Sequence, residues 1–538
     1  MDQSLVAEVQ AWITDDPDPI TASQLQHWLD SKNEAELRTS FNGFLQFGTA
    51  GLRGPIRPGP SGMNRAVVGR TAAGIVVYMK ERNLTSVVIG RDARYGSEDY
   101  TFETAEIMSG AGMTVYVLPR PLPTPVLAFA TNALRCDVGI MVTASHNPPQ
   151  DNGYKVYLGG TVDGIEYRGS QIISPTDALI AHKIDAITSL KEQPRGKVWT
   201  VLGEEIIEKY IECTASLATT PGTLKIIYTA MHGVGTETLQ RVFHKAGYPS
   251  LILVDAQAAP DPDFPTVAFP NPEEPGAIDL ALETAKTFDA DLVIANDPDA
   301  DRCAVAVKDP MTSWRMLRGD ELGAILGESI ARKSSGGIFA NSIVSSSILK
   351  KIAGHYNLEF KETLTGFKWL AKVKGLTFGY EEALGYAVDA KTVNDKDGIS
   401  AAISVAQIAT DLAANGKTLL DLLDEIWARH GFHATEQISM RLSDLSKVDV
   451  ILGGLRNNPP QNIAGRVVTS INDLATPTDG LPPTDGLRIW LDGGIRIIIR
   501  PSGTEAKMKC YIEVIEKDSK TAQVVLDQLR PPLKELLS

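Results

Sequence analysis

Apolar runs of strand length alternate along this chain with segments in which apolar residues recur every three or four positions. SVVIGRD (86–92) and MTVYVLP (113–119) are typical of buried strands, and YTFETAEIMSGAG (100–112) between them has helical spacing and ends on glycine. Residues 1 to about 40 also have helical spacing. Repeated strand–helix–strand units predict mixed or parallel sheets covered by helices.

This alternation returns twice further along the chain. It is carried by KIIYTAM (225–231), TETLQRVFHKAG (236–247), SLILVDA (250–256) and DLVIAND (291–297), and then by GGIFANSIVSS (336–346), SSILKKIAGHY (346–356), FGYEEA (378–383) and GISAAISVAQIATDLAANG (398–416). We therefore expect an α/β protein with three similar α/β domains and mixed sheets, at residues 1–210, 211–325 and 326–435.

After about residue 435 the pattern changes to strands followed by one helix. The strand-like segments are ISMRL (438–442), RIWLDGGIRIIIRPS (488–502) and KMKCYIEVIE (507–516), and the helical one is AQVVLDQLRPPLKELL (522–537). They predict a C-terminal α+β domain at 436–538, with the four domains around a central cleft. Its segment ATPTDGLPPTDGLR (475–488) is rich in turn formers and predicts a surface loop.

The overall charge narrows the class of partner. The chain has 538 residues, with 52 Lys and Arg against 66 Asp and Glu, which gives a formal net charge of −14. This argues against a nucleic-acid binder, which needs a basic face. A local basic cleft can still bind a small anionic substrate.

The cysteines and the N-terminal sequence predict a cytoplasmic location. Cys136, Cys213, Cys303 and Cys510 form no CxxC pair, so we expect reduced thiols. MDQSLVAEVQAW at the start lacks the apolar core of a signal peptide, and no apolar run reaches the roughly 18 residues of a membrane span. We expect no membrane partner and a monomer or homodimer.

Polar loops that follow apolar strands carry the candidate chemistry, because ligands in α/β sheets bind at the ends of strands. The first is GIMVTASHNPPQ (139–150), in which an apolar run leads directly to Ser145 and His146. A lone serine in such a loop is most often a turn residue. Here Pro148 and Pro149 fix the backbone. The nucleophile elbow of hydrolases needs glycine two residues on either side of the serine, and this chain has Thr143 and Asn147 there.

The second loop, NDPDADRC (296–303), places three carboxylates at alternate positions directly after an apolar run. Asp297, Asp299 and Asp301 would repel one another unless a cation lies between them. A calcium EF-hand would need Gly and Glu where this chain has Arg302 and Lys308. A magnesium site with open positions for phosphate oxygens fits better, and a solvated acidic turn is the structural alternative.

Two later loops have weaker signals of their own. FGYEEALGY (378–386) contains Glu381 and Glu382, which are either acid/base groups, acceptors for sugar hydroxyls or a solvated surface pair. RPSGTEAK (500–507) combines the guanidinium of Arg500 with a tight turn of hydroxyls and backbone N–H groups, a combination suited to phosphate. The structural alternative is an ordinary turn beside an exposed arginine.

Two glycine-containing stretches do not match nucleotide-binding motifs. FGTAGLRGPIRPG (47–59) has the wrong glycine spacing for a dinucleotide site, and NGKT (415–418) lacks the upstream glycine of a P-loop because Asp411 occupies that position. Arg53 and Arg57 remain as phosphate contacts on what the glycines predict to be a loop.

Taken together, TASHNP, DPDADR and RPSGTE resemble the motifs of the α-D-phosphohexomutase superfamily, the phosphoglucomutase/phosphomannomutase family. The match runs in order from Gly48 to Lys507. FGTAGLRG, QDNGYKVY and EEALGY are most similar to the branch of phosphoglucomutases and phosphopentomutase-type enzymes. The resemblance implies an isomerase that moves a phosphoryl group between Ser145 and a sugar phosphate through a sugar bisphosphate intermediate. It implies Mg²⁺ as cofactor and a sugar bisphosphate of the glucose 1,6-bisphosphate type as activator.

The resemblance also implies roles for individual residues. Ser145 would carry the phosphoryl group and, with Asp297, Asp299 and Asp301, would hold Mg²⁺. Arg53, Lys155 and His146 would lie around the reacting oxygen, with the general acid or base among them. The substrate-binding residues would be Arg302, Lys368, Glu381, Glu382, Arg500, Ser502, Gly503 and Thr504.

Two departures from the family pattern bear on the substrate. Ala383 stands where the sugar loop usually has Ser or Thr, and DPDADR replaces the commoner DGDGDR while keeping all three carboxylates. The expected reaction interconverts sugar 1-phosphate and 6-phosphate with glucose favoured. Phosphopentomutase and phosphomannomutase activities are alternatives, and a phosphatase or a catalytically inactive phosphosugar-binding protein are the alternatives from other classes.

Overall fold

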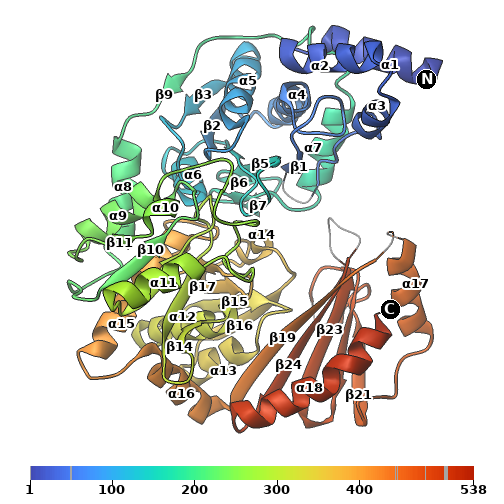
Figure 1. The fold of residues 1–538 in the computed structure, drawn as a ribbon. Helices are drawn as coiled ribbons and strands as arrows, with labels where there is room; N and C mark the ends of the chain where they lie inside the picture. The colour runs from blue at the N-terminus through green and yellow to red at the C-terminus, as the bar shows by residue number, and fades with distance from the viewer. Residues whose placement is uncertain are drawn as a thin grey trace. The chain divides into compact units, whose positions relative to one another are not determined.

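The computed structural model describes residues 2–48, 51–442, 444, 446–478, 480–501 and 507–537. The chain divides into two compact units, each discontinuous in sequence. The first contains Met1–Leu317 and Ala383–Asp411, and the second contains Arg318–Glu382 and Leu412–Ser538. Figure 1 labels many of the elements of both.

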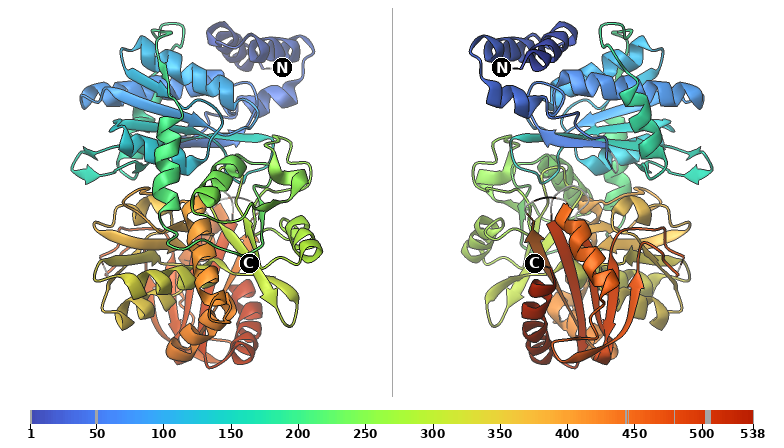
Figure 2. Two further views of the ribbon diagram at one scale, coloured as in Figure 1. Left: turned by 90° about the vertical axis from the view of Figure 1, so that its left-hand side faces the viewer. Right: turned by 90° about the vertical axis from the view of Figure 1, so that its right-hand side faces the viewer.

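The first unit begins with three short helices, α1 (Gln3–Asp15), α2 (Pro19–Asp30) and α3 (Glu34–Ser40), which confirms the helical prediction for the first 40 residues. They enclose a small core of their own that includes Val9, Leu25 and Leu37. The carboxylate of Asp15 accepts hydrogen bonds from Ser189 Oγ and from the backbone N–H of Leu190. The helices, dark blue in Figure 2, are thereby anchored to the rest of the unit.

The first sheet of this unit has the order β1-β5-β4-β2-β3-β9, with β8 beside β5. Strands β4, β2, β3 and β9 run parallel, whereas β5 is antiparallel to β4 and β1 is antiparallel to β5. The strands are β1 (Gly51–Pro55), β2 (Ser86–Arg91), β3 (Thr114–Val117), β4 (Val138–Val142), β5 (Asp151–Leu158), β8 (Ser170–Gln171) and β9 (Thr200–Val201), with a separate hairpin of β6 (Thr161–Val162) and β7 (Ile165–Glu166). The helices are α4 (Arg65–Glu81), α5 (Ser97–Gly110), α6 (Thr124–Ala133), α7 (Thr176–Asp185) and α8 (Glu205–Ala215).

The second sheet has the order β11-β10-β12-β13-β14. Strands β11, β10 and β12 are parallel, β13 is antiparallel to β12, and β14 is antiparallel to β13. Its strands are β10 (Ile226–Thr229), β11 (Ile252–Leu253), β12 (Leu292–Ala295), β13 (Ala304–Asp309) and β14 (Ser313–Met316). The helices that accompany it are α9 (Gly235–Lys245), α10 (Asp255–Ala258) and α11 (Asp279–Phe288). After Ala383 the chain returns to this unit with β18 (Gly385–Ala387) and α15 (Gly398–Ala413).

The second unit contains a parallel sheet with β15 (Ile338–Ser342) between β16 (Glu359–Thr363) and β17 (Leu376–Glu381). Helices α12 (Gly319–Lys333), α13 (Ile348–His355), α14 (Phe367–Leu370) and α16 (Leu419–His430) belong to it. Its other sheet, which is antiparallel, has the order β19-β24-β23-β22-β21-β20. These strands are β19 (Phe432–Arg441), β20 (Asn462–Ile463), β21 (Arg466–Asp473), β22 (Leu487–Leu491), β23 (Ile495–Pro501) and β24 (Lys507–Glu516), with the 3-10 turn η1 (Asp492–Gly494) and helices α17 (Ser446–Asn457) and α18 (Ser519–Leu536).

The apolar run at 488–502 is two strands rather than one. Asp492, Gly493 and Gly494 form a turn between β22 and β23, and both glycines have φ of 77°. This left-handed backbone favours glycine and closes the hairpin. Helix α18 then covers β19 and β24 with a face that includes Val525, Leu526 and Leu529 (Figure 1).

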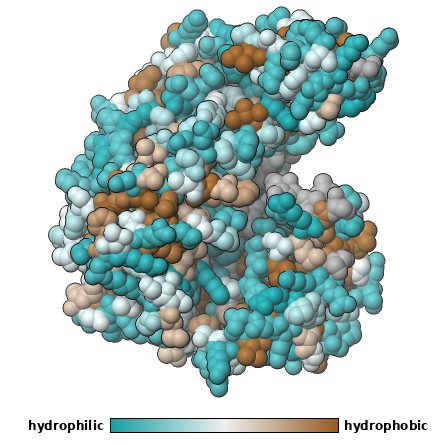
Figure 3. Space-filling view, in the orientation of Figure 1, coloured by the Kyte–Doolittle hydropathy of each residue, from teal (hydrophilic) through white to brown (hydrophobic). Residues whose placement is uncertain are grey.

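The predicted surface loop at 475–488 is exposed over most of its described residues and ends in β22. On the face shown in Figure 3, hydrophobic residues form separate patches among hydrophilic ones. Among the described residues, helices both long and apolar enough to cross a membrane are absent.

A buried acid in the second unit should make that unit less stable as the pH rises. Asp320 on α12 accepts hydrogen bonds from Ser346 N, Tyr380 Oη and Thr435 Oγ1, and burial raises its pKa to about 7. Between the ordinary aspartate pKa and this value the folded state binds a proton that the unfolded chain has released. The stabilisation from this group is complete below the ordinary pKa and is lost as the pH rises through about 7.

We therefore expect Asp320→Asn to reduce the loss of urea resistance between about pH 5 and pH 8, because asparagine cannot ionise. Asp424→Asn, at an exposed position on α16 of the same unit, is the matched control. Urea midpoints across this pH range provide the measurement. Equal pH dependence of Asp320→Asn and the unmodified protein would contradict the assignment.

Candidate active site

Ser145 lies in a strained loop at the end of a buried strand. Strand β4 is buried along its whole length, and the chain turns three residues after it ends. Ser145 has a φ of 51° and is 2% exposed. Its N–H donates to Thr143 Oγ1 over 2.9 Å, and the N–H of Asn147 donates to the carbonyl of Ala144. A left-handed φ in a residue other than glycine is costly, so the surrounding contacts must hold this loop.

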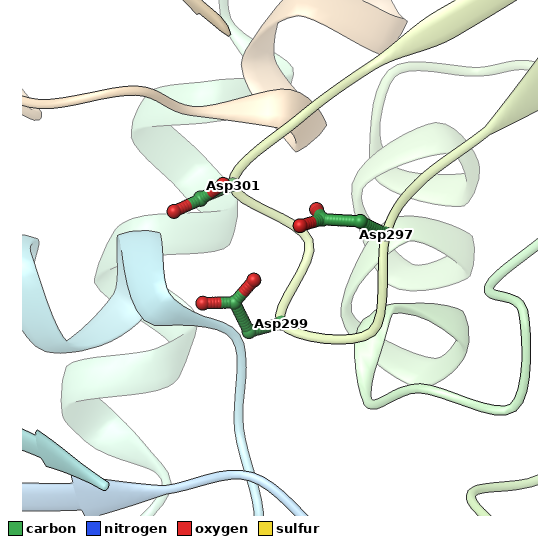
Figure 4. Close-up of side chains that lie close together, drawn as sticks. All are labelled: Asp297, Asp299 and Asp301. Atoms are coloured by element: carbon green, nitrogen blue, oxygen red, sulfur yellow. The ribbon is translucent and has the colours of Figure 1, made fainter. Parts of the chain in front are cut away.

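The three aspartates lie in the turn between β12 and β13 of the second sheet. Ala300 has a φ of 54°, and its N–H donates to the carbonyl of Asp297 over 2.8 Å, which closes the turn. One carboxylate oxygen from each of Asp297, Asp299 and Asp301 lies within 4.8 Å of the others. Figure 4 shows the three carboxylates extending toward a common space.

Hydrogen bonds join the Ser145 loop and the aspartate turn within the first unit. Ser145 Oγ donates to Asp297 Oδ2 over 2.6 Å. Lys155 Nζ of β5 donates to Asp299 Oδ2 over 2.7 Å and to Asp301 Oδ2 over 2.8 Å. The structure thus brings together the serine, the three carboxylates and a lysine that are far apart in sequence.

The electrostatics of the three carboxylates differ. Burial and the neighbouring carboxylates raise the pKa of Asp297 to about 7. Burial also acts to raise the pKa of Asp301, but the ammonium groups of Lys155 and Lys396 outweigh it and hold this pKa well below its usual value. The pKa of Asp299 is likewise lowered against the effect of burial, chiefly by Lys155.

The turn fits a divalent cation. Asp299 Oδ1 and Asp301 Oδ1 are buried, and neither accepts a hydrogen bond from any residue that the structure describes. A buried carboxylate oxygen without a donor is costly, whereas a hard cation uses oxygen ligands of this kind. Ser145 Oγ, which the resemblance implies as a fourth ligand, lies next to Asp297.

The remaining predicted residues of this unit surround the same site. Arg53 Nη1 donates to Asn147 Oδ1 over 3.0 Å, and His146 Nδ1 lies 3.3 Å from Ser145 Oγ. Arg302 Nε lies 4.0 Å from both Asp297 Oδ2 and Asp301 Oδ1. Arg302 therefore lies beside the acidic turn and Arg53 beside the Ser145 loop, while burial holds the pKa of His146 well below its usual value and leaves it neutral.

The expected loop around Arg53 is wrong, because Arg53 lies within strand β1. Its backbone pairs with Gly153 of β5, and Gly51 pairs with Lys155. A Cβ atom on Gly51 would lie 1.7 Å from the carbonyl oxygen of Tyr154. The glycine thus permits close strand pairing, which fixes Arg53 opposite Gly153, two residues before Lys155 in β5.

Three residues at the site were not found from the sequence. Lys396 Nζ lies 2.9 Å from Asp301 Oδ2, and Thr124 Oγ1 donates to Asp299 Oδ2 over 2.6 Å. Arg94 donates to backbone carbonyls of the Ser145 loop. The signal for Arg94 and Thr124 was their place just after strand-like segments, whereas Lys396 lies in a polar stretch before a helix without such a signal.

The other predicted substrate-binding residues belong to the second unit. The N–H of Gly366 donates to Glu381 Oε1 over 2.6 Å, so the start of α14, which carries the buried Lys368, contacts the end of β17. Glu382 Oε2 accepts hydrogen bonds from Ser342 Oγ and Ser345 Oγ. Arg500 lies partly buried in β23. Ser502, Gly503 and Thr504 lie outside the described residues.

Comparison with known proteins identifies the family. Three family models match, described as phosphoglucomutase/phosphomannomutase alpha/beta/alpha domain I at residues 45–190, domain II at 206–310 and domain III at 318–430. The chain belongs to the phosphoglucomutase/phosphomannomutase family. The resemblance seen in its motifs is confirmed, as is the fold class of three α/β domains with mixed sheets and a further C-terminal domain. This family member is a mutase, an enzyme of the isomerase class.

Relatives of this mutase carry more than one name. A protein of Haemophilus influenzae named as a probable phosphomannomutase is 47% identical over 483 residues, which is 88% of this chain and 98% of the relative. A phosphopentomutase of Mus musculus is 33% identical over 600 aligned positions, covering 99% of this chain and 95% of the relative. A crystal structure of a phosphoglucomutase/phosphomannomutase family protein from Burkholderia thailandensis has a TM-score of 0.71 with 20% identity, covers 91% of this chain and 97% of its own, and supports the fold.

We expect the mutase to bind a divalent cation through the three aspartates. Asp299→Asn should weaken Mg²⁺ binding by at least about 10- to 100-fold. Substitution of residues that only hydrogen-bond to a metal ligand already weakens metal binding by this amount, so loss of a ligand should weaken it at least as much. Asp289→Asn is the matched control, since Asp289 has a left-handed backbone that asparagine tolerates and its side chain is 84% exposed. Calorimetric titration with Mg²⁺ measures both. Unchanged affinity in Asp299→Asn would count against the site.

Proposed function

We propose that this mutase interconverts sugar 1-phosphates and 6-phosphates through a phosphorylated Ser145, with glucose phosphates favoured. The observation that supports this most strongly is the position of Ser145 Oγ, 2.6 Å from a carboxylate of the acidic turn. The ammonium group of Lys155 forms ion pairs with the other two carboxylates, those of Asp299 and Asp301. A nucleophile, a cation site and fixed positive charges are what phosphoryl transfer needs.

The proposed reaction has two transfers. In the first, a sugar hydroxyl attacks the phosphorus on Ser145, the Oγ–P bond breaks, a new O–P bond forms and the hydroxyl proton leaves to a base. The sugar bisphosphate then turns over, Ser145 Oγ attacks the phosphorus of its other phosphate, the O–P bond to the sugar breaks, and that sugar oxygen takes up the proton from the base. No phosphoryl group is lost over the cycle, so the sum of the two steps is an isomerisation.

The residues of the first unit have complementary parts in this chemistry. Lys155 has a pKa raised well above its usual value because Asp299 and Asp301 outweigh the effect of burial, so it stays charged. With Arg53 and Arg302 it would balance the negative charge of the transferred group. Mg²⁺ on the aspartates would add charge neutralisation at the phosphoryl oxygens. Of the three candidates for accepting the hydroxyl proton, Lys155 is excluded because it stays charged, which leaves His146 and Arg53.

A mutase is favoured over the readings from other classes. An inactive phosphosugar-binding protein would have no need of a serine in a strained backbone beside three carboxylates. Ser145 is 2% exposed, so bulk water has little access to it, which argues against a phosphatase.

We assign sugar and phosphate binding to the second unit. Glu381 and Glu382 would accept hydrogen bonds from sugar hydroxyls, and Lys368 and Arg500 would contact the phosphate that is not transferred. In the structure Glu382 accepts hydrogen bonds from two serine hydroxyls and Glu381 accepts one from the N–H of Gly366. The segment with Ser502, Gly503 and Thr504 completes the proposed phosphate grip.

Ser145→Ala should abolish transfer. We expect kcat to fall by at least about 10³-fold, because the group that carries the phosphoryl is lost. Intact mass after incubation with glucose 1,6-bisphosphate should show one added phosphoryl group in the unmodified protein and none in the variant. Ser216→Ala, at an exposed position in the same unit, is the control and should behave as the unmodified protein. Mutase activity near the normal rate in Ser145→Ala would overturn the mechanism.

The sugar loop predicts relaxed specificity. The side chain of Ala383 cannot form a hydrogen bond with a sugar hydroxyl. The enzyme therefore lacks about 1–3 kcal/mol of preference for sugars that place a hydroxyl at this position. We expect glucose 1-phosphate to be used and ribose 1-phosphate to be accepted, in keeping with the phosphopentomutase name of one relative. The test is kcat/KM for glucose, mannose, ribose and deoxyribose 1-phosphates with one bisphosphate activator. A preference for mannose of about tenfold or more over both glucose and ribose would favour the alternative that the Haemophilus name suggests.

A further inference from the structure

One arginine side chain binds the backbone of the Ser145 loop at four points. Arg94 Nη2 donates to the carbonyl oxygens of Ser145 and Asn147, each over 2.6 Å. Its Nη1 donates to the carbonyl oxygens of Pro148 over 2.8 Å and of Asp151 over 3.2 Å. Among side chains, only the planar guanidinium group of arginine has enough N–H donors in a fixed arrangement to reach four carbonyl oxygens at once.

Three of these carbonyls, those of Ser145, Asn147 and Pro148, lie between β4 and β5, and the fourth belongs to Asp151 at the first position of β5. The chain leaves β4 at Val142 and enters β5 at Asp151, so the intervening backbone lacks the hydrogen bonds of a continuous ladder. Buried carbonyls without partners are costly, and a left-handed Ser145 adds backbone strain. Arg94 supplies a donor to the carbonyls of Ser145, Asn147 and Asp151, and it adds a second donor at the carbonyl of Pro148, which also accepts from the N–H of Asp151.

Arg94 is itself held in place by two residues, Asp92 and Phe264. It is 5% exposed. Its backbone N–H donates to Asp92 Oδ1 over 3.0 Å, and its Nε lies 3.4 Å from Asp92 Oδ2. The guanidinium carbon lies 4.8 Å from the centre of the Phe264 ring, which comes from the segment after α10 of the second sheet. Phe264 is 3% exposed and has a φ of 46°, so its own segment is tightly fixed.

We propose that Arg94 is a positioning residue that fixes the Ser145 loop for in-line phosphoryl transfer, and that Phe264 keeps Arg94 in its place. The inference rests on the proposed function. Arg94 acts through main-chain carbonyls and touches none of the reacting atoms. Displacement of a nucleophile by about 1 Å can cost 10²-fold in rate, so the loss of these contacts should be seen mainly in kcat.

The decisive variant is Arg94→Lys, which keeps the charge but removes the fork. We expect kcat to fall by about 100-fold while KM for the sugar phosphate changes less than about threefold, because the substrate contacts lie elsewhere. Arg91→Lys is the matched control, since Arg91 lies three residues away in β2 and pairs with the exposed Glu98. It should keep the normal kcat.

Two further measurements separate positioning from a general loss of structure. Hydrogen–deuterium exchange should increase in the peptide spanning 143–151 of Arg94→Lys and stay unchanged in the C-terminal sheet. Guanidinium ions at low concentration should restore part of the rate of Arg94→Ala but none of that of Ser145→Ala. Phe264→Leu, a milder change, should lower kcat by less than Arg94→Lys does and leave KM unchanged.

The outcomes distinguish this inference from the proposed function. If Ser145→Ala stays active, the phosphoserine mechanism fails, and the exchange of peptide 143–151 still shows whether Arg94 holds the loop. If Ser145→Ala is inactive while Arg94→Lys has normal kcat and normal exchange in that peptide, the mechanism stands and the role of Arg94 is overturned. A rise in exchange throughout Arg94→Lys, with no rescue of Arg94→Ala, would likewise overturn positioning in favour of a general structural role.

Discussion

The ammonium group of Lys155 between Asp299 and Asp301 is the contact on which the rest of the site depends. Three buried carboxylates within 4.8 Å of one another would repel strongly without compensation. Lys155 reaches them from β5 of the first sheet, and Lys396 reaches Asp301 from the segment before α15. Removing one partner of a buried ion pair leaves an uncompensated charge, so this cluster couples two sheets electrostatically as well as sterically.

Strands carry two of the positively charged side chains of the site, whereas turns carry the serine and the carboxylates. Lys155 and Arg53 lie on paired strands, whereas Ser145 and the aspartates lie on the turns that leave β4 and β12. The turns carry the left-handed residues Ser145 and Ala300. Backbone strain is thus present in both turns, and the paired strands around them constrain it.

The motifs and most elements could be predicted because they depend on local pattern. The polar segments at 143–148 and 297–301 do follow buried strands, as their apolar neighbours indicated. Arg94 and Lys396 were not predicted because their roles depend on the fold and not on local pattern. The role of Arg94 depends on the order of the strands in the sheet, and that of Lys396 depends on the return of residues 383–411 to the first unit. Arg94 follows β2, which lies beside β4 in the sheet, and its contacts bridge about fifty residues of sequence.

Local pattern also misled in two places. The glycines around Arg53 indicated a loop, but Gly51 allows a strand to approach β5 closely. The apolar run from 488 to 502 concealed a turn, because apolar strands with the sequences LRIWL and IRIIIRP lie on both sides of Gly493. In each case glycine had a role in packing or turning that a single sequence does not distinguish.

The discontinuity of the first unit has a consequence for how the protein is made. Residues 318–382 of the second unit are synthesised before Ala383–Asp411, which complete the first. The returning segment supplies Lys396, and Asp397 accepts a hydrogen bond from Tyr210 while the N–H of Gly398 donates to the carbonyl of Ala300. A nascent chain that ends near Leu317 therefore holds all three aspartates but lacks one of their two lysines. During synthesis the first unit therefore stays incomplete until residues 318–382 of the second unit have been made. Folding from the N-terminus cannot complete the first unit before part of the second has been synthesised.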